Sequence, residues 1–569
     1  MSAITTAASQ VGRHVVGATR TALGSGSPIR GSFWAPGLTL AAVAGGAAMG
    51  PSLFPKDPKL QTAVVGVSSL LGFGAGAVVE GIGRTAGRFG PSARMGTLGA
   101  LAGAGLLTAA GVSLSHADER SNAAAAVGTT GLVAGTGAAT ALVTTSLARH
   151  VPNHGRLAQL AAPIVAGGAV LARALHDNAT RSTPYLLPDV DLPHVDPNEP
   201  LALRKLTRLT PTEAMPGVDP STVQLDKLPP NGLRFVLEGT SMEEIRRTMG
   251  EEPLAEPRRV YVGLDEAPAD LTEPELIEWM SDRAMDRLEA TGSFERSRIL
   301  VVPTTSTGFV DPQAPLSAEM MSRGDIATVA MQAGHKKAAF ELGNLDRATA
   351  MHERLLEKIT ARIASMPESE RPIIDVYGES YGAWTGQNAY IGHGVGGLDE
   401  HGVDQAMYVG SPRGSQWRNE VLGADGVQSI RSAASAQDLS AADARGTRVT
   451  FLTHDADPVS NFAVDNLWKR PDWLPTDGER GENIPPQQRW WPAVTGLQLA
   501  VDQQLAQTFT PGVLEAKGHD YRSEVGFVMR RAFGFDDVSD TQVARIREYG
   551  RQSEVRWTAA KADLLPPTG

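Results

Sequence analysis

The sequence has no cysteine, and only 5% of its 569 residues are aromatic. Without cysteine there can be no disulfide, no thiolate metal site and no cysteine nucleophile. The 63 acidic residues outnumber the 52 lysines and arginines, and a net charge of −11 argues against a nucleic-acid-binding protein. No residue pattern indicates a metal, a nucleotide or a flavin, so we expect no cofactor. The chain is too long for a single core, and at least two structural units are expected.

Charged residues are also missing from long runs in the first third of the chain. The runs are Ala35–Phe54, Ala63–Val79, Met95–Ser115, Asn122–Ala148 and the weaker Leu157–Ala172. Crossing a bilayer core takes about 20 apolar residues, and soluble helices rarely lack charges over such a length. The pattern therefore predicts a multi-pass transmembrane domain, with the lipid bilayer as partner. A soluble alanine-rich helical bundle is the alternative.

The basic residues predict the orientation of these runs. Arg13, Arg20 and Arg30 precede the first run, and the loops richer in lysine and arginine then alternate, which places the N-terminus in the cytoplasm. Five spans would put the C-terminal domain outside the cytoplasm and four would put it inside, depending on the run Leu157–Ala172. We predict five spans, and hence a multi-pass protein of the cell membrane with an extracytoplasmic C-terminal domain.

After the apolar runs, the composition changes twice. Residues 179–257 are polar and rich in proline, which is typical of an extended linker. From residue 258 onwards, β-rich and helical patterns alternate, which predicts a mostly parallel sheet with helices on both faces. The expected organisation is a cytoplasmic segment 1–31, a transmembrane helical domain 32–178, a linker 179–257, a catalytic domain 258–555 and a tail 556–569.

The segment Ile373–Gly382 joins a short β-rich run to the pattern Gly-x-Ser-x-Gly, and a helix-compatible stretch follows. This strand, turn and helix is typical of the nucleophile elbow of an α/β-hydrolase, where a serine hydroxyl projects above the sheet. Gly378 and Gly382 leave room for the tight crossing. The helix N-terminus, beginning at Tyr381, offers backbone N–H groups to an oxyanion. Ser380 is the candidate nucleophile.

The acid and the base of a triad should follow the serine in that order. Arg448–Leu452 is a predicted strand, and two carboxylates, Asp455 and Asp457, come directly after it. An acid past the carboxyl end of a strand lies on the catalytic edge of an open sheet. We favour Asp457, because Asp-Pro-Val begins a turn that can aim the side chain inward. Either carboxylate could instead simply cap a turn.

His519 is the candidate general base, because it follows a glycine on a loop near the end of the domain and no later histidine exists. His454, His401 and His393 are its competitors. A second oxyanion donor should come from the loop after the predicted strand Arg298–Val302. That loop contains Thr305, Ser306 and Thr307, and an ordinary turn is the alternative interpretation.

Several further segments, in this order, resemble a known family. They are Arg259–Leu264, Thr307–Pro312, Gly324–Asp325, Val329–Gln332, the elbow, His454–Val459, Pro471–Leu474, Arg489–Pro492 and Gly518–Tyr521. The chain is similar, over roughly residues 35 to 535, to the bacterial α/β-hydrolase family with an N-terminal multi-pass transmembrane region. The resemblance implies an α/β-hydrolase fold and a triad of Ser380, Asp457 and His519. Tyr381 stands where the family more often has leucine, a departure that bears on substrate preference.

The functional expectation is a membrane-anchored serine hydrolase, esterase- or lipase-like, that forms an acyl-enzyme. A membrane tether favours an amphiphilic ester or acyl substrate, such as lipid or cell-envelope acyl groups. An acyltransferase would use the same triad. An alternative from another class is a non-catalytic membrane scaffold or transport protein with a hydrolase-like domain. The sequence carries no indication of oligomeric state.

Overall fold

The structure is a computed structural model that describes residues 35–54, 56, 61, 64–69, 72, 223–224, 227–335, 341–434, 446–475, 478–506 and 509–564. The chain divides into two compact units. One comprises Met1–Ser182 with Asn461–Ala506, and the other Thr183–Ser460 with Gln507–Gly569. The chain therefore leaves the second unit after Ser460 and returns to it at Gln507.

The second unit is built on a seven-stranded sheet in which all pairs are parallel. Its spatial order is β1-β3-β2-β4-β5-β7-β6. The strands are β1 (Arg258–Val262), β2 (Arg298–Pro303), β3 (Ile326–Met331), β4 (Ile373–Glu379), β5 (Gln405–Val409), β6 (Val427–Ile430) and β7 (Val449–Leu452). The predicted parallel sheet is confirmed. Strands such as β3, buried along their whole length, read as continuous apolar runs because helices cover both faces.

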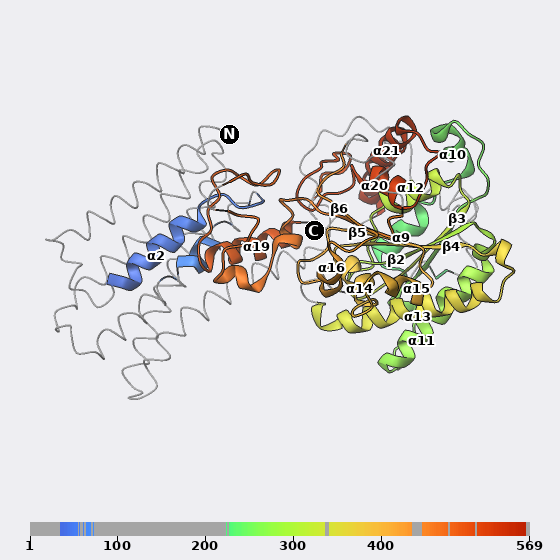
Figure 1. Cartoon of the computed structure of the whole chain (residues 1–569), viewed down its shortest axis with the longest axis horizontal. Helices are drawn as coiled ribbons and strands as arrows, with labels where there is room; N and C mark the ends of the chain where they lie inside the picture. Colours follow the sequence, from blue (N-terminus) through green and yellow to red (C-terminus); the bar gives the residue numbers. More distant parts are fainter. Residues whose placement is uncertain are drawn as a thin grey trace. The chain divides into compact units, whose positions relative to one another are not determined.

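Helices pack on the two faces of this sheet and enclose two hydrophobic cores (Figure 1). The first face carries α9 (Pro230–Leu237), α10 (Met242–Met249), α12 (Gln313–Met321), α20 (Val525–Ala532) and α21 (Asp540–Leu564). The second carries α11 (Glu273–Ala290), α13 (Leu345–Ala364), α14 (Tyr381–Asn388), α15 (Gly397–Glu400) and α16 (Gln416–Val421). Short 3₁₀ turns are η3 (Leu264–Glu266), η4 (Ser293–Glu295), η6 (Leu342–Asn344), η7 (Glu368–Glu370) and η8 (Gly394–Gly396). Helix α21 continues past the expected domain end at residue 555.

The prediction of an extended linker over residues 179–257 is wrong for the residues of this range that the structure describes. Helices α9 and α10 lie in it, and Phe235, Val236 and Ile245 are buried in the first core. Arg259 of β1 makes the packing specific, because its guanidinium pairs with Glu319 of α12 at 2.6 Å and donates to the Phe235 carbonyl at 2.7 Å. The proline-rich composition concealed α9, which begins with Pro230 in its first turn, whereas the capping box at Ser241 does indicate the start of α10.

The first unit contains α2 (Ala35–Ala48), η10 (Val464–Leu467) and α19 (Val494–Leu505), with α18 (Pro458–Asn461) at the boundary. Ala48 of α2 packs in one cluster with Val494 and Val501 of α19. Beside this cluster, the Lys56 ammonium pairs with the buried Asp502 carboxylate at 2.5 Å. A segment that lies between the candidate acid and the candidate histidine in sequence is thus part of the N-terminal unit.

Among the residues described, no helix is long and apolar enough to cross a membrane. The first charge-free run gives the 14-residue helix α2, followed by a turn, where we expected a span of about 20 residues. The runs at 95–115, 122–148 and 157–172, most of 63–79, and the segment 1–31 lie outside the described residues.

We predict that Arg259→Met lowers the free energy of unfolding by about 3–5 kcal/mol, because it leaves the buried Glu319 carboxylate without its cation. Urea unfolding followed by fluorescence measures this. The control is Arg246→Met, which removes a bidentate ion pair that is exposed to solvent, Arg246–Glu252. Equal unfolding midpoints for the two variants would contradict the packed arrangement of α9, β1 and α12.

Candidate active site

Ser380 occupies a strained turn between β4 and α14. Its φ of 56° and ψ of −120° place a residue with a side chain in a region that favours glycine. The Ser380 N–H donates to the Val409 carbonyl of β5 at 3.0 Å, and its carbonyl accepts from Trp384 N–H at 3.1 Å, which opens α14. The strain is thus held by hydrogen bonds to the neighbouring strand and to the helix.

The two flanking glycines are required by close contacts. A Cβ on Gly378 would lie 2.9 Å from the Ala383 Cα, and one on Gly382 would lie 2.1 Å from the Pro303 carbonyl oxygen. The first contact is within the elbow, and the second is with the end of β2. Since backbone atoms cannot swing away as a side chain does, both positions exclude larger residues. These contacts confirm the steric reason for glycine at both positions that the Gly-x-Ser-x-Gly motif predicted.

Asp457 and His519 form a buried pair. The carboxylate follows β7, and its Oδ2 lies 2.9 Å from the His519 Nδ1. The same oxygen accepts from the Tyr521 hydroxyl at 2.7 Å, and Oδ1 accepts from Val459 N–H at 2.8 Å. Burial opposes the charged form, but His519 and these donors outweigh it and lower the pKa of Asp457 below its usual value. The acid is therefore held ionised against the imidazole.

The other candidate carboxylate, Asp455, points elsewhere. Its side chain is 24% exposed and pairs with Arg431 at 3.2 Å. The remaining candidate histidines have other partners too. His393 pairs with Glu400 on the surface, His401 contacts the Gly397 carbonyl at 3.0 Å, and His454 contacts Glu524. Within the described residues, His519 is the histidine that the structure brings to Asp457.

His519 and Ser380 lie at the same edge of the sheet. Gly410 follows Val409, the residue that accepts from Ser380 N–H, and a Cβ on Gly410 would lie 2.6 Å from the His519 Cε1. Gly410 also has a φ of 56°. The position therefore requires a residue that lacks a side chain and adopts a left-handed backbone, and glycine meets both requirements. His519 Nε2 is buried and has no hydrogen-bond partner among the described residues, Ser380 included. It is the ring atom left to accept a proton.

The segment that carries His519 is fixed on both sides by contacts that the sequence did not predict. The Gly518 carbonyl contacts His454 Nδ1 at 2.9 Å, and Tyr521 reaches Asp457. Asp520 accepts two hydrogen bonds of 2.8 Å from Arg522. Arg522 also donates to Glu554 of α21 at 2.6 Å. The position of Tyr521 and Arg522, two and three residues after His519, was the available signal, but most of their partners lie far away in sequence.

The loop after β2 lies against the elbow, as expected for an oxyanion loop. Thr305 and Ser306 are buried, while Thr307 is half-buried and bound through its carbonyl and hydroxyl by the Asn231 amide. The Thr305 N–H is occupied by the Phe309 carbonyl at 3.0 Å. Ser306 N–H donates to no backbone acceptor among the described residues.

Tyr381 donates its hydroxyl hydrogen to the Glu341 carbonyl at 3.2 Å. Its backbone N–H is the first of α14 and has no intrahelical acceptor by the geometry of a helix N-terminus. Together with Ser306, this leaves two backbone donors near the nucleophile that the local structure does not use.

The residue directly before the nucleophile, Glu379, belongs to a buried acidic cluster. Burial and the neighbouring Asp311 and Asp520 raise the pKa of Glu379 well above its ordinary value. Burial also raises the pKa of Asp311 to about 7. Burial among these acids therefore favours the neutral form of Glu379, which limits negative charge beside Ser380, where an oxyanion would have to form.

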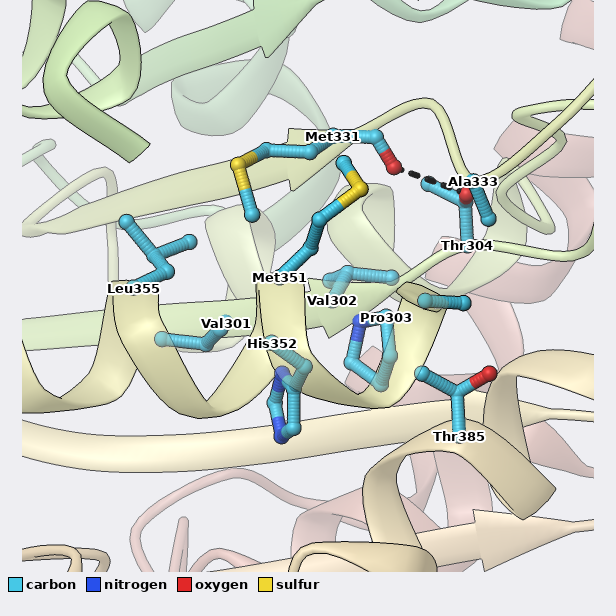
Figure 2. Close-up of a pocket in the computed structure, with 11 residues that line it drawn as sticks. Val301, Val302, Pro303, Thr304, Met331, Ala333, Met351, His352, Leu355 and Thr385 are labelled. Atoms are coloured by element: carbon cyan, nitrogen blue, oxygen red, sulfur yellow. Dashed lines mark hydrogen bonds between the residues drawn. The ribbon is translucent and has the colours of Figure 1, made fainter. Parts of the chain in front are cut away.

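A cavity of about 20 Å³ lies between β2, β3, α13 and α14 (Figure 2). Its lining is mainly apolar, with His352 and Thr385 on one side. The His352 Nε2 and the Thr385 Oγ1 are buried without a hydrogen-bond partner among the described residues. Burial lowers the pKa of His352 to about 3, so the ring is neutral. The cavity has room for one water molecule and not for an ester substrate.

A parallel sheet of this kind, with a strained serine after its fourth strand, defines the chain as an α/β protein with a nucleophile elbow. Residues 258–546 match the sequence profile described as alpha/beta-hydrolase family, and residues 49–186 match that of the alpha/beta-hydrolase family N-terminus. The chain belongs to the alpha/beta-hydrolase family. No curated protein and no solved structure matches it. The resemblance stated above is confirmed for the family, and the matches carry neither a bacterial origin nor a transmembrane region.

We predict that Asp457→Asn slows the labelling of Ser380 by a fluorophosphonate on the order of 10²–10⁴-fold, because the amide no longer fixes the imidazole tautomer. Asp455→Asn is the matched control and should label at close to the wild-type rate, since Asp455 faces Arg431. Labelling rates measured by in-gel fluorescence decide between them. The reverse ranking would show that Asp455 is the orienting acid.

Proposed function

We propose that the protein is a membrane-anchored serine hydrolase, esterase- or lipase-like, that cleaves ester bonds through an acyl-enzyme. The observation that carries this proposal is the strained Ser380 at the same sheet edge as the buried Asp457–His519 pair. A strained residue of this kind is costly, and a nucleophile that must project above the sheet gives it a reason to persist. Family membership supports a hydrolase-type domain.

In the proposed reaction, the His519 Nε2 takes the proton of the Ser380 hydroxyl as its Oγ attacks the ester carbonyl. The Tyr381 N–H and one N–H of the loop 305–307, for which Ser306 is available, stabilise the oxyanion. The tetrahedral intermediate collapses, the C–O bond to the alcohol breaks, and His519 returns its proton to the leaving oxygen. Water then attacks the acyl-enzyme with the same proton transfers and releases the acid. Asp457 keeps the imidazole oriented and stabilises its cationic form throughout.

The variant Ser380→Ala tests this function. It should abolish p-nitrophenyl ester hydrolysis and fluorophosphonate labelling while the unfolding midpoint stays at or above that of the wild type, since the mutation removes only the nucleophile. Ser365→Ala, at the exposed end of α13, is the control and should retain full activity. A wild-type protein that is folded but neither labelled nor hydrolytic would favour a non-catalytic scaffold or transport protein. Acyl transfer to an added alcohol would identify an acyltransferase.

Membrane anchoring rests on the charge-free runs of the sequence, most of which fall within the segment that matches the family's N-terminal profile. We propose five spans, a cytoplasmic N-terminus and an extracytoplasmic catalytic domain, by the distribution of basic residues. This arrangement would present the active site to amphiphilic esters such as lipid or cell-envelope acyl groups.

Reporter fusions test the topology. Alkaline phosphatase fused after Pro188, which is active only outside the cytoplasm, should be active, and a cytoplasm-active reporter at the same point should be silent. The opposite result would mean four spans and an internal active site. A full chain that stays in the soluble fraction after cell lysis and ultracentrifugation would contradict membrane anchoring altogether.

A further inference from the structure

A second buried histidine–carboxylate pair lies beside the candidate triad. The His454 Nε2 contacts the Glu524 carboxylate, and its Nδ1 lies 2.9 Å from the Gly518 carbonyl oxygen. The ring stacks on Tyr521 with centroids 4.1 Å apart. Both side chains are buried, with exposures of 5% for His454 and 0% for Glu524.

These contacts require particular hydrogen-bond donors. A carbonyl oxygen only accepts, so the His454 Nδ1 must carry a proton. The Glu524 Oε1 already accepts from the Ser432 hydroxyl at 2.6 Å and from Ala433 N–H at 2.5 Å. Glu524 also stands at the N-cap position of α20, where the helix dipole favours its negative form. An ionised Glu524 needs a second N–H from the ring, which makes His454 an imidazolium.

His454 contacts the chain on both sides of the candidate base, at Gly518 and at Tyr521. Its ring contacts the carbonyl of Gly518, the residue before His519, which has a φ of 60°. Its backbone N–H donates to the Tyr521 hydroxyl at 3.1 Å, and that hydroxyl donates to Asp457. The carbonyl contact thus fixes the chain before His519, while the tyrosine contact fixes the acid to which His519 is bound.

We propose that His454, held as a buried imidazolium by Glu524 and the Gly518 carbonyl, is the positioning residue that orients His519 toward Ser380. The proposal rests on the hydrolase function proposed above. His454 touches neither the nucleophile nor the Nδ1 of His519, and it acts through Gly518 and Tyr521. A charged ring that binds an acceptor on each side fixes the loop more strongly than a neutral ring, which has one N–H.

The charge on His454 should make activity depend on pH. Burial by itself lowers the pKa of His454, but the contact with Glu524, the Gly518 carbonyl and the nearby Asp457 outweigh it and raise the pKa above 6.5. Burial likewise opposes the charged form of Glu524, but His454, Ser432 and the Ala433 N–H outweigh it and lower its pKa.

A group whose pKa is raised by folding stabilises the folded arrangement at low pH, and this contribution is lost as pH rises through its folded pKa. The profile of kcat/KM against pH should therefore fall at alkaline pH, with His454 setting this alkaline limb.

Three variants test the proposal by pH profile. Glu524→Gln should move the alkaline limb to lower pH, because the carboxylate that holds the charge is gone. His454→Gln should reduce kcat/KM at least tenfold, mainly through kcat, and should abolish that limb. His393→Gln is the matched control, since His393 also pairs with a glutamate, but on the surface. Its profile should superimpose on that of the wild type. An alkaline limb that stays at the same pH in Glu524→Gln would overturn the proposal.

Nuclear magnetic resonance of ¹⁵N-histidine-labelled full-length protein provides a test that does not depend on hydrolysis. At pH 6.5, the His454 ring should show two N–H signals, and those of His519 should shift in His454→Gln but not in His393→Gln. A single His454 N–H signal would mean a neutral pair in which Glu524 donates the proton, and would overturn the charged form. Unshifted His519 signals in His454→Gln would overturn the positioning role, even if the protein proves to have no hydrolase activity.

Discussion

The backbone crossing at Ser380 is the constraint on which the rest of the site depends. A left-handed φ at a serine is tolerated only because the surroundings leave no alternative. The Val409 carbonyl binds its N–H, and the absence of side chains at Gly378 and Gly382 lets α14 and the end of β2 approach closely. Sheet register then aligns the ends of β4, β5 and β7, so the residues that follow these strands meet at one edge.

Buried charged side chains hold the segment that carries His519 in place. The segment carrying His519 is bound by Asp457, by His454 with Glu524, and by Arg522 with its carboxylate partners. Buried ion pairs add little net stability over apolar packing, but removing one partner is costly, so such a network specifies one geometry. Burial and the neighbouring Asp311 and Asp520 raise the pKa of the adjoining Glu379, which favours its neutral form beside the nucleophile.

Sequence patterns predicted the strands and the elbow, because these features depend on residues that are close together in the chain. The predicted strands Arg298–Val302 and Arg448–Leu452 match β2 and β7 to within one residue at each end, because buried parallel strands are continuous apolar runs. The elbow was predictable because its steric demand falls on glycines two positions from the serine.

Long-range contacts could not be predicted in this way. His454 and Glu524 are 70 positions apart, and nothing local indicates that they meet. The packing of α9 was hidden by proline-rich composition, and the edge strand β6 by a polar sequence without clear periodicity. Asp457 was separated from Asp455 by a turn argument, and the structure adds the reason, a hydrogen bond to His519 that only one of them makes.

The central claim is that one strained serine is the reactive nucleophile of this chain. The most direct measurement is to treat the folded full-length protein with a fluorophosphonate, digest it and locate the adduct by mass spectrometry. The account predicts one adduct per chain, on the peptide containing Ser380 and at that residue. An adduct on another residue, or an unmodified Ser380 in protein shown to be folded, would contradict it.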